Sequence, residues 1–449
     1  MASLAMKSHG QGARATSNGD TTKVPLELTS PYRSATLNFR AEFISITAQS
    51  SAYVAGKMNR VYFDNNATTP LAPEVFEAMR PFLLEDYGNA SSIHWFGQRA
   101  RAGVEKARAQ VARLLNARAS EIVFTSGGTE SDNAAILGIV EAARGERKHV
   151  VTTAIEHPAV LSATKALEKR GVGVSCVRVG ASGVIDPADV AAAVRPETVL
   201  ISVMHANNEL GTVQPLEEIG RLARERDIYL HTDAVQSIGK IPVDVERLGV
   251  DLLALSAHKL NGPKGVGALY LRRGTAVRPL MHGGHHERDR RPGTENVAGI
   301  VGLGAAAEAA RAHLADEQGR LAALRDRLEA GILERVAFVA VNGDRARRVP
   351  NTTNLTFDYL EGEGFVIAMD LRGIACSTGS ACSSGSLEPS HVLSAIGLRP
   401  EQARATIRFS LGRFNSDEDV ETTLRILPAV VEQLRVVSPH YRAPVASGR

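Results

Sequence analysis

Short apolar runs alternate with amphipathic segments from about residue 61 to residue 437. Runs of this kind, without polar alternation, are typical of strands that are buried on both faces of a parallel sheet. The sequence predicts strands at Ile122–Thr125, Val150–Thr153, Val174–Val179, Val199–Val203, Ile228–Thr232, Leu252–Ser256 and Gly267–Leu271. Because helical segments separate most of them, we expect an α/β fold with a large, mainly parallel, seven-stranded sheet.

Apolar residues spaced three or four apart indicate the helices. The first is expected to begin at Pro73, because proline suits the first helical position. Its predicted buried stripe consists of Val75, Phe76, Met79 and Phe82. Further helices are expected over about 92–116, from about Thr129, and over about 297–336.

The long Ala-, Leu- and Arg-rich helix at 297–336 predicts a connection to a second, smaller α/β domain. That domain is expected to contain strands near 353–357, 374–377 and 406–410. In chain order we expect an extension (1–59), a segment joining the small domain (60–72), a large domain (73–315), a small C-terminal domain (316–437) and a tail (438–449).

Residues 1–59 are rich in Ser, Thr and Ala and lack the alternation that begins at Val61. Their shortage of acidic residues fits an organellar targeting peptide. They also fit an upstream extension with the true start at Met58, three residues before Val61. We favour the extension, and with it a cytoplasmic protein, and leave this segment out of the fold prediction.

Charge and composition exclude several classes of protein. A formal net charge of +3 from 52 basic and 49 acidic residues, without basic stripes, argues against nucleic-acid binding. No apolar run approaches the roughly 18 residues of a membrane span. The three cysteines, Cys176, Cys376 and Cys382, cannot form a disulfide framework in a chain of 449 residues and fit a reducing compartment.

Lysine is scarce here, with 10 lysines against 42 arginines, and Lys259 follows a strongly apolar expected strand. Ligands of open α/β sheets bind at the carboxyl ends of strands. A lysine there could bind a carbonyl cofactor as a Schiff base, although an ordinary lysine of a surface loop would explain its position equally well.

Asp233 ends another expected strand, and pyridoxal phosphate needs a carboxylate opposite its ring nitrogen. An isolated Asp at a strand end is more often a cap, but the pair together favours the cofactor.

A glycine turn, Ser126–Ser131, links an expected strand to a helix. Backbone N–H groups of such a turn and of the helix N-terminus can bind a phosphate. A Walker-type loop is excluded because no Gly-Lys-Ser/Thr follows, and a tight connection without any ligand is the alternative. Ser256 and His258, next to Lys259, could supply further donors.

The motifs that carry these candidates occur together. They are Tyr62-Phe-Asp-Asn-Asn-Ala-Thr-Thr-Pro, Phe124-Thr-Ser-Gly-Gly-Thr-Glu-Ser-Asp-Asn, Glu156-His157, His205-Ala-Asn-Asn-Glu-Leu-Gly, His231-Thr-Asp-Ala-Val-Gln, Ser256-Ala-His-Lys, Gly293-Thr-Glu-Asn, Gly379-Ser-Ala-Cys-Ser-Ser-Gly-Ser-Leu-Glu-Pro-Ser and Ile407-Arg-Phe-Ser-Leu-Gly. With these motifs in order over about 61–437, the chain resembles the aminotransferase class V family and, within it, the cysteine desulfurases. The resemblance implies the pyridoxal-phosphate-dependent transferase fold of type I, L-cysteine as substrate and a homodimer.

The resemblance also implies a role for each matching residue. Lys259 holds the cofactor and moves the proton at the substrate Cα, Asp233 pairs with the ring nitrogen, and His157 stacks on the ring as a further acid–base group. The residues implied in cofactor binding are Gly128, Thr129, His157, Asn208, Asp233, Gln236, Ser256, His258, Lys259 and Thr294, of which Thr294 reaches the phosphate of a neighbouring subunit. The substrate carboxylate is bound by Arg408, with help from Asn89.

Cys382 selects among reactions, because the fold and cofactor alone also allow transamination or β-lyase chemistry. The glycines and serines around Cys382 are poor core material and fit a mobile nucleophile. The resemblance makes Cys382 the persulfide carrier and a transient iron–sulfur ligand shared with a scaffold protein. Cys376 and Cys176 are expected to be structural core residues.

The expected activity is conversion of L-cysteine to L-alanine, with sulfur passed from Cys382 to an iron–sulfur scaffold protein. A selenocysteine lyase or a transaminase on the same fold is the alternative among enzymes, and a non-catalytic binding protein is the alternative outside them. Three segments resemble the nitrogen-fixation type more than the housekeeping type. They are Asp64-Asn-Asn-Ala, His205-Ala-Asn-Asn-Glu-Leu-Gly-Thr and Gly283-Gly-His-His-Glu-Arg-Asp-Arg-Arg-Pro-Gly-Thr.

Overall fold

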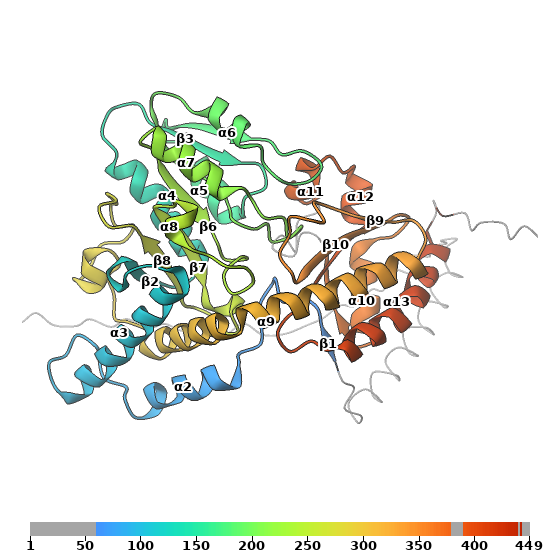
Figure 1. Ribbon diagram of the computed structural model, residues 1–449, viewed down its shortest axis with the longest axis horizontal. Helices are drawn as coiled ribbons and strands as arrows, with labels where there is room; N and C mark the ends of the chain where they lie inside the picture. The colour runs from blue at the N-terminus through green and yellow to red at the C-terminus, as the bar shows by residue number, and fades with distance from the viewer. Residues whose placement is uncertain (1–59, 379–388, 439–440, 442–449) are drawn as a thin grey trace, which may run out of the picture. The chain divides into compact units, whose positions relative to one another are not determined.

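A seven-stranded sheet organises the larger part of the protein (Figure 1). The structure is a computed structural model that describes residues 60–378, 389–438 and 441. The strands are β2 (Ile122–Thr125), β3 (His149–Thr153), β4 (Gly173–Val177), β5 (Thr198–Ser202), β6 (Tyr229–Asp233), β7 (Leu252–Ser256) and β8 (Gly267–Leu271). Their order is β2-β8-β7-β6-β5-β3-β4, and only β8 runs antiparallel to its neighbours. The predicted fold class is confirmed.

Successive residues of these strands bury on opposite faces of the sheet, which explains the unbroken apolar runs. On β2, Val123 packs into the core on one face, whereas Phe124 packs into the core on the other. The first face is covered by α4 (Gly128–Ala142) and α5 (Pro158–Glu168). The second is covered by α3 (Trp95–Leu115), α6 (Pro187–Ala193), α7 (Leu216–Glu225), α8 (Val245–Leu248) and the first half of α9 (Val297–Arg335).

Helix α9 connects two hydrophobic cores. Its first half contributes Ile300 and Leu303 to a core of the large sheet, and its second half contributes Leu324 and Leu328 to a separate core. Figure 1 shows α9 passing from α2 (Pro73–Leu84) and α3 at one end to α13 (Asp417–Val436) at the other. The predicted long connecting helix is therefore present, while the domain boundaries at its two ends stay predictions.

The second core lies against a four-stranded antiparallel sheet of order β12-β13-β10-β9. Its strands are β9 (Val339–Val341), β10 (Thr352–Phe357), β12 (Ser377–Thr378) and β13 (Thr406–Ser410). Helices α10 (Gly362–Asp370) and α13 pack on it. The shorter elements of the C-terminal part are α11 (His391–Ala395) and α12 (Pro400–Arg404).

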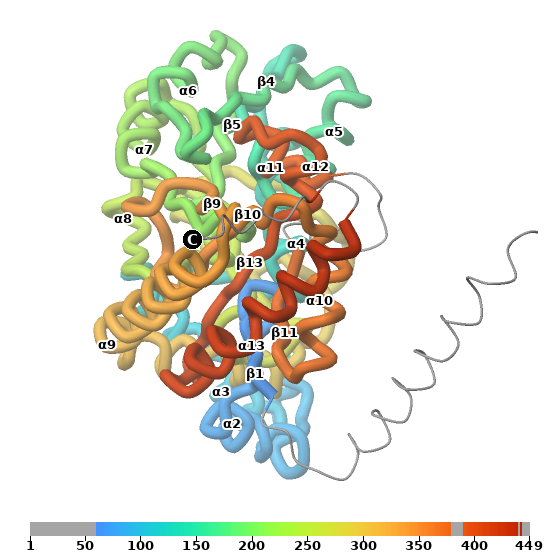
Figure 2. Tube along the Cα trace, turned by 90° about the vertical axis from the view of Figure 1, so that its right-hand side faces the viewer, coloured from blue at the N-terminus to red at the C-terminus, as the bar shows by residue number. Residues whose placement is uncertain are grey.

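The beginning of the described chain lies beside its C-terminal part. Strand β1 (Val61–Tyr62) pairs in parallel with β11 (Ile374–Ala375), and Asp64 forms a bridge to Ser410 at the end of β13. In Figure 2, β1 accordingly lies next to β11 and α13.

The described residues also include the 3-10 turns η1 (Ala119–Glu121), η2 (Ala257–Lys259) and η3 (His286–Asp289).

Two predictions about burial are wrong. Phe76 is 46% exposed, because α2 lies at the periphery and buries Val75 alone among its residues. Cys176 is exposed, because β4 is an edge strand of the large sheet and most of its residues are incompletely covered. Cys376 is buried, as expected for a structural cysteine. Within the described residues, no helix is long and apolar enough to cross a membrane.

Candidate active site

The carboxyl ends of the parallel strands bring the two main candidates to one edge of the sheet. Asp233 is the last residue of β6, and Lys259 ends η2, the short turn that follows β7 directly. Strands β6 and β7 are paired neighbours, with Asp233 opposite Ala254. The pairing predicted from two strand ends is therefore present, at the edge where open α/β sheets bind ligands.

A third strand supplies His157, which caps the N-terminus of α5 after β3. Its Nδ1 accepts the backbone N–H of Ala159 at 3.2 Å, so the proton of the neutral ring lies on Nε2. Burial lowers the pKa of His157, which favours this neutral ring. Polar atoms of His157, Asp233 and Asp132 all lie within 4.8 Å of one another.

Asp233 is held in place by its own backbone, since its Oδ1 accepts the N–H of Val235 at 2.9 Å. Burial raises the pKa of Asp233, while the neighbouring His157 and Lys259 lower it. A carboxylate that is 6% exposed and faces two basic groups is suited to pair with a protonated ring nitrogen.

Asp132, on the first turns of α4, places a second carboxyl group next to Asp233. It is 1% exposed, and within the described chain its Oδ1 has no hydrogen-bond partner. The ring Nε2 of His231 lies 3.4 Å away, but burial lowers the pKa of His231 to about 3, so that ring is neutral. Burial also raises the pKa of Asp132 well above its usual value. Of the two carboxyl groups, Asp132 is therefore the one whose protonated form burial favours more.

The Lys259 side chain points at the segment that follows β1. Its Nζ donates to the carbonyl oxygen of Asn66 and, at 2.7 Å, to that of Ala67. The neighbouring His258 contacts the Thr68 hydroxyl through Nδ1 at 3.1 Å, and burial lowers its pKa to about 4. His258 is thus a neutral ring beside the lysine.

The glycine turn predicted to bind phosphate lies at the N-terminus of α4. Gly127 has a φ of +156°, and a Cβ added to Gly128 would lie 2.7 Å from Cγ2 of Val235. No side chain of the described residues caps this helix end, so the first backbone N–H groups, including those of Gly128 and Thr129, stay available as donors. Ser256 closes the turn, because its Oγ lies 3.7 Å from a Cβ position built on Gly127.

These residues fit pyridoxal phosphate on structural grounds. An uncapped helix N-terminus on a 15-residue helix suits the phosphate, and a buried carboxylate beside a lysine suits the ring nitrogen and the carbonyl. The same cluster of Asp132, His157 and Asp233 also has the spacing of a metal site.

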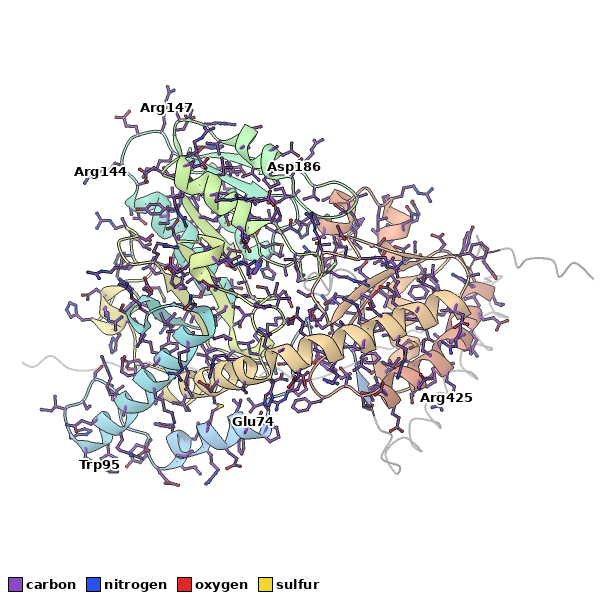
Figure 3. The ribbon with its side chains drawn as sticks, viewed as in Figure 1. Glu74, Trp95, Arg144, Arg147, Asp186 and Arg425 are labelled. Carbon is purple, nitrogen blue, oxygen red and sulfur yellow. The ribbon has the colours of Figure 1, made fainter. Side chains whose placement is uncertain are left out.

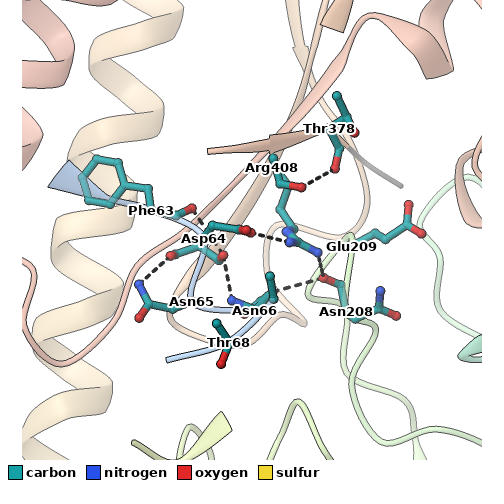
Figure 4. A network of polar contacts seen from close by, with 12 residues as sticks. Phe63, Asp64, Asn65, Asn66, Thr68, Asn208, Glu209, Thr378 and Arg408 are labelled. Carbon is teal, nitrogen blue, oxygen red and sulfur yellow. Dashed lines mark hydrogen bonds and ion pairs between the residues drawn. The ribbon is translucent and has the colours of Figure 1, made fainter. Parts of the chain in front are cut away.

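Arg408, on β13, is almost completely buried, with 1% of the residue exposed. Its Nη2 donates to Asp64 Oδ1 at 2.6 Å and its Nη1 to the carbonyl oxygen of Asn208 at 2.9 Å (Figure 4). Its Nε is buried without a partner among the described residues. The arginine predicted to bind substrate is therefore already engaged with an internal carboxylate.

The other predicted residues lie in different settings. Asn208 and Gln236 are buried near the site, and the Gln236 Nε2 donates to the carbonyl oxygen of Asn66 at 2.9 Å. Thr294 is exposed and lines one hollow together with Ser126 of the same chain. Asn89 lies in the loop between α2 and α3, where it bonds Ser91 and Ser92. Cys382 lies outside the described residues.

Sequence reasoning missed Asp64, Asn66, Asp132 and Lys240. The first three fall inside motifs that carry the resemblance, but adjacency in the chain does not show which of their atoms enter the site. Lys240 carried one signal, since it is another of the few lysines.

Comparison with known proteins agrees with this geometry. Residues 61–423 match the aminotransferase class-V family. The chain is 52% identical over 380 residues to a protein of Dictyoglomus turgidum named cysteine desulfurase IscS, covering 85% of this chain and 96% of that protein. A solved structure described as a NifS-like protein is 39% identical, with a TM-score of 0.79, covering 84% of this chain and 100% of that one. Another, described as SspA in complex with cysteine, is 40% identical, with a TM-score of 0.71, covering 79% and 100%. The chain therefore belongs to the aminotransferase class-V family and, within it, to the pyridoxal-phosphate-dependent cysteine desulfurases.

Proposed function

We propose that this protein converts L-cysteine to L-alanine and carries the released sulfur as a persulfide on Cys382. The observation that supports this most is that Asp233, His157 and Lys259, which follow or end β6, β3 and β7, interact electrostatically with one another, in a chain 52% identical to a cysteine desulfurase. The part of Cys382 rests on its sequence motif.

The site residues divide between the two ends of the cofactor. Pyridoxal phosphate bound here supplies an electron-accepting ring next to the substrate Cα. Lys259 would hold it covalently, Asp233 would pair with its ring nitrogen, and His157 would contact the ring. The groups that would hold the phosphate and the ring oxygen are Gly128, Thr129, Ser256, His258, Asn208 and Gln236.

Substrate binding would use the donors of Arg408 that its internal contacts leave over. Each Nη donates one N–H, to Asp64 or to the Asn208 carbonyl, so an incoming carboxylate can use the second N–H of an Nη, use Nε, which is buried without a partner among the described residues, or displace one of these acceptors. Once the substrate amine has taken its place on the cofactor, the freed Lys259 amine would remove the Cα proton. The neighbouring carbonyl oxygens of Asn66 and Ala67 hold it close to the site and can stabilise it once protonated.

Sulfur transfer uses the Cys382 thiolate. It attacks the substrate sulfur, a sulfur–sulfur bond forms, and the carbon–sulfur bond breaks with its electron pair left on the carbon side. That carbon then takes up a proton, which makes the methyl group of alanine, and Lys259 returns a proton to Cα. The products are alanine and a Cys382 persulfide, so no external oxidant is required.

The protein acts as a homodimer in this proposal. Several large apolar side chains around α2 and α3 are 55–91% exposed: Leu83, Leu84, Tyr87, Ile93 and Trp95. Figure 3 shows Trp95 pointing away from the rest of the chain. A second copy of the chain covering this surface would also bring the exposed Thr294 toward a neighbouring phosphate site. A monodisperse dimer in light scattering supports this, and a monomer at micromolar concentration argues against it.

The sulfur acceptor is an iron–sulfur scaffold protein, with Cys382 as a transient cluster ligand during transfer. The motifs that resemble the nitrogen-fixation type favour a scaffold that serves nitrogenase maturation. The transfer takes place in the cytoplasm in this proposal. Transfer of labelled sulfur from Cys382 to a purified scaffold, and its dependence on direct contact, tests this part separately.

The first experiment measures the absorption spectrum of the purified protein and then the products after addition of L-cysteine. We expect a cofactor band that changes with cysteine and, with a thiol reductant present to release the persulfide sulfur, equal amounts of sulfide and alanine. Reduction with borohydride followed by peptide mass spectrometry should place the cofactor on Lys259 and not on Lys240. A band without sulfide would favour a transaminase or a selenocysteine lyase. Absence of a band after added pyridoxal phosphate would favour a binding protein.

A further inference from the structure

A second lysine, Lys240, is buried next to the candidate active site. It lies in the turn after β6 and is 8% exposed. Its Nζ donates to Oε1 of Gln236 at 2.6 Å and to Oδ1 of Asn66 at 3.1 Å. Lysines are almost never buried unless they are paired, and here both acceptors are neutral amide oxygens. Neither the cofactor roles nor the substrate roles proposed above use this residue.

Both amide groups turn their oxygens toward Lys240. The NH₂ groups of Gln236 and Asn66 face the carbonyl oxygens of Asn66 and Asn208, which can only accept, so Lys240 Nζ is the donor in both of its contacts. The NH₂ group of Gln236 consequently faces away from Lys240, and one of its N–H bonds donates to the Asn66 carbonyl oxygen at 2.9 Å. The other N–H remains to be donated elsewhere.

Asn66 carries the effect of Lys240 to the remaining parts of the site. Its Oδ1 also accepts from Nδ2 of Asn351 at 3.1 Å, and its own Nδ2 donates to the Asn208 carbonyl at 3.1 Å and to the Thr352 hydroxyl at 2.9 Å. The Asn66 carbonyl oxygen accepts from both Gln236 and Lys259. One buried amine thus orients Gln236 and the segment against which the Lys259 amine rests.

The surroundings of Lys240 favour an uncharged amine over an ammonium ion. Burial lowers its pKa well below the usual value, and the nearby cations Lys259 and Arg408 lower it further. Asp64 neutralises Arg408 from its other side. Two hydrogen bonds to neutral acceptors are what an uncharged amine can make, so the burial of Lys240 is consistent with its contacts.

We propose that Lys240 is a positioning residue of the cofactor site, which holds the Gln236 amide so that an N–H group, and not the oxygen, faces the ring oxygen of pyridoxal phosphate. The inference rests on the proposed function. An N–H donated to that oxygen stabilises its anionic form, which makes the proton shared with the adjacent Lys259 nitrogen easier to lose. Lys240 therefore lowers the pH at which the bound cofactor changes colour.

The test is a pH titration of the absorbance of protein-bound pyridoxal phosphate, without substrate. In Lys240→Met the midpoint should rise by about 0.5 to 1 pH unit, the size expected for loss of one hydrogen bond. Lys240→Gln, which keeps one donor in a similar volume, should give a smaller rise. Lys169→Met, a change at an exposed lysine, should leave the midpoint unchanged.

A double variant separates positioning from a general structural role. If Lys240 acts through Gln236, its substitution should have no further effect on the midpoint in a Gln236→Leu background. Should Lys240→Met fail to fold, as judged by near-ultraviolet circular dichroism, the Gln variant carries the test. A wild-type midpoint in the folded Lys240 variant, or a full shift that persists in Gln236→Leu, would overturn the inference. If the wild-type protein itself shows no cofactor band, the proposed function fails instead.

Discussion

The Arg408 guanidinium donates to the Asp64 carboxylate at 2.6 Å, while 1% of Arg408 and 21% of the Asp64 side chain are exposed. Removing one partner of a buried ion pair leaves the other charge without compensation. We therefore expect Asp64→Asn to lower the free energy of unfolding by about 2–4 kcal/mol. Urea denaturation measures the change.

The matched control for Asp64 is Glu77→Gln, which breaks the exposed pair between Glu77 and Arg80. Exposed pairs contribute little, so this change should lower the free energy of unfolding by less than about 0.5 kcal/mol. Equal losses in the free energy of unfolding would mean that the Asp64–Arg408 pair stabilises the protein no more than an exposed ion pair does.

Replacing Asp132 or Asp233 by asparagine should lower cysteine turnover to very different extents. Asp132→Asn replaces a protonated carboxyl by an amide of similar shape, and cysteine turnover should stay within about threefold of wild type. Asp233→Asn removes the anion required at the ring nitrogen, and turnover should fall on the order of 100-fold or more. Steady-state assays of sulfide at saturating cofactor compare them. A loss in Asp132→Asn as large as that in Asp233→Asn would show that Asp132 carries a charge.

Glu156 should make the protein less stable as the pH rises. Burial raises its pKa from 4.5 to about 8, so the folded state binds a proton that the unfolded state releases above pH 4.5. The free energy of unfolding therefore declines between about pH 4.5 and pH 8 because of this group. Glu156→Gln removes the decline and keeps an oxygen for Thr153 and Met204. Relative to wild type, the variant should gain on the order of 2–4 kcal/mol between pH 5 and pH 8 in urea denaturation. A difference that does not change with pH would contradict the prediction.

Substitutions of Cys382 and of the exposed Cys176 should distinguish the sulfur-carrying cysteine from a thiol without a role in catalysis. Cys382→Ser should keep the cofactor absorbance and lower sulfide release at least about 100-fold, because a hydroxyl group cannot accept the sulfur. Cys176→Ser, at an exposed position of the edge strand β4, should leave both unchanged. Substantial sulfide release by Cys382→Ser would refute the assigned role.

The strands of the large sheet could be located from the sequence because they are buried on both faces. Ile122–Thr125 and Leu252–Ser256 are continuous apolar segments, and the structure begins and ends those strands at the predicted residues. Strands β1 and β9, which were not predicted, have two and three residues. Runs so short carry no periodicity, and their pairing partners are distant in the chain, so nothing local distinguishes them from loops.

The site was predictable only where a residue type is itself informative. Lys259 and Asp233 end apolar strands, which places them at one edge of a parallel sheet before any coordinates are known. Asp132 gives no such signal, since an acidic residue in the first turns of a helix is ordinarily explained by the helix dipole. That its side chain turns inward follows from the packing of α4 on the sheet.

The pairing of β1 with the C-terminal part of the chain also sets when the site can form during synthesis. Asp64 and Arg408 are separated by 344 positions, and Val61 pairs with Ile374. At about 5–20 residues per second, the ribosome needs on the order of 20 to 70 s to make Arg408 after Asp64 has been added. Throughout that interval the nascent chain holds Asn66 without its partner from β13, and for most of it also without its partner from β10, so Lys259 can be held correctly only near the end of translation. The finished cofactor site is consequently a property of the completed chain, and a polypeptide truncated before β13 would bind pyridoxal phosphate poorly even with its whole large sheet in place.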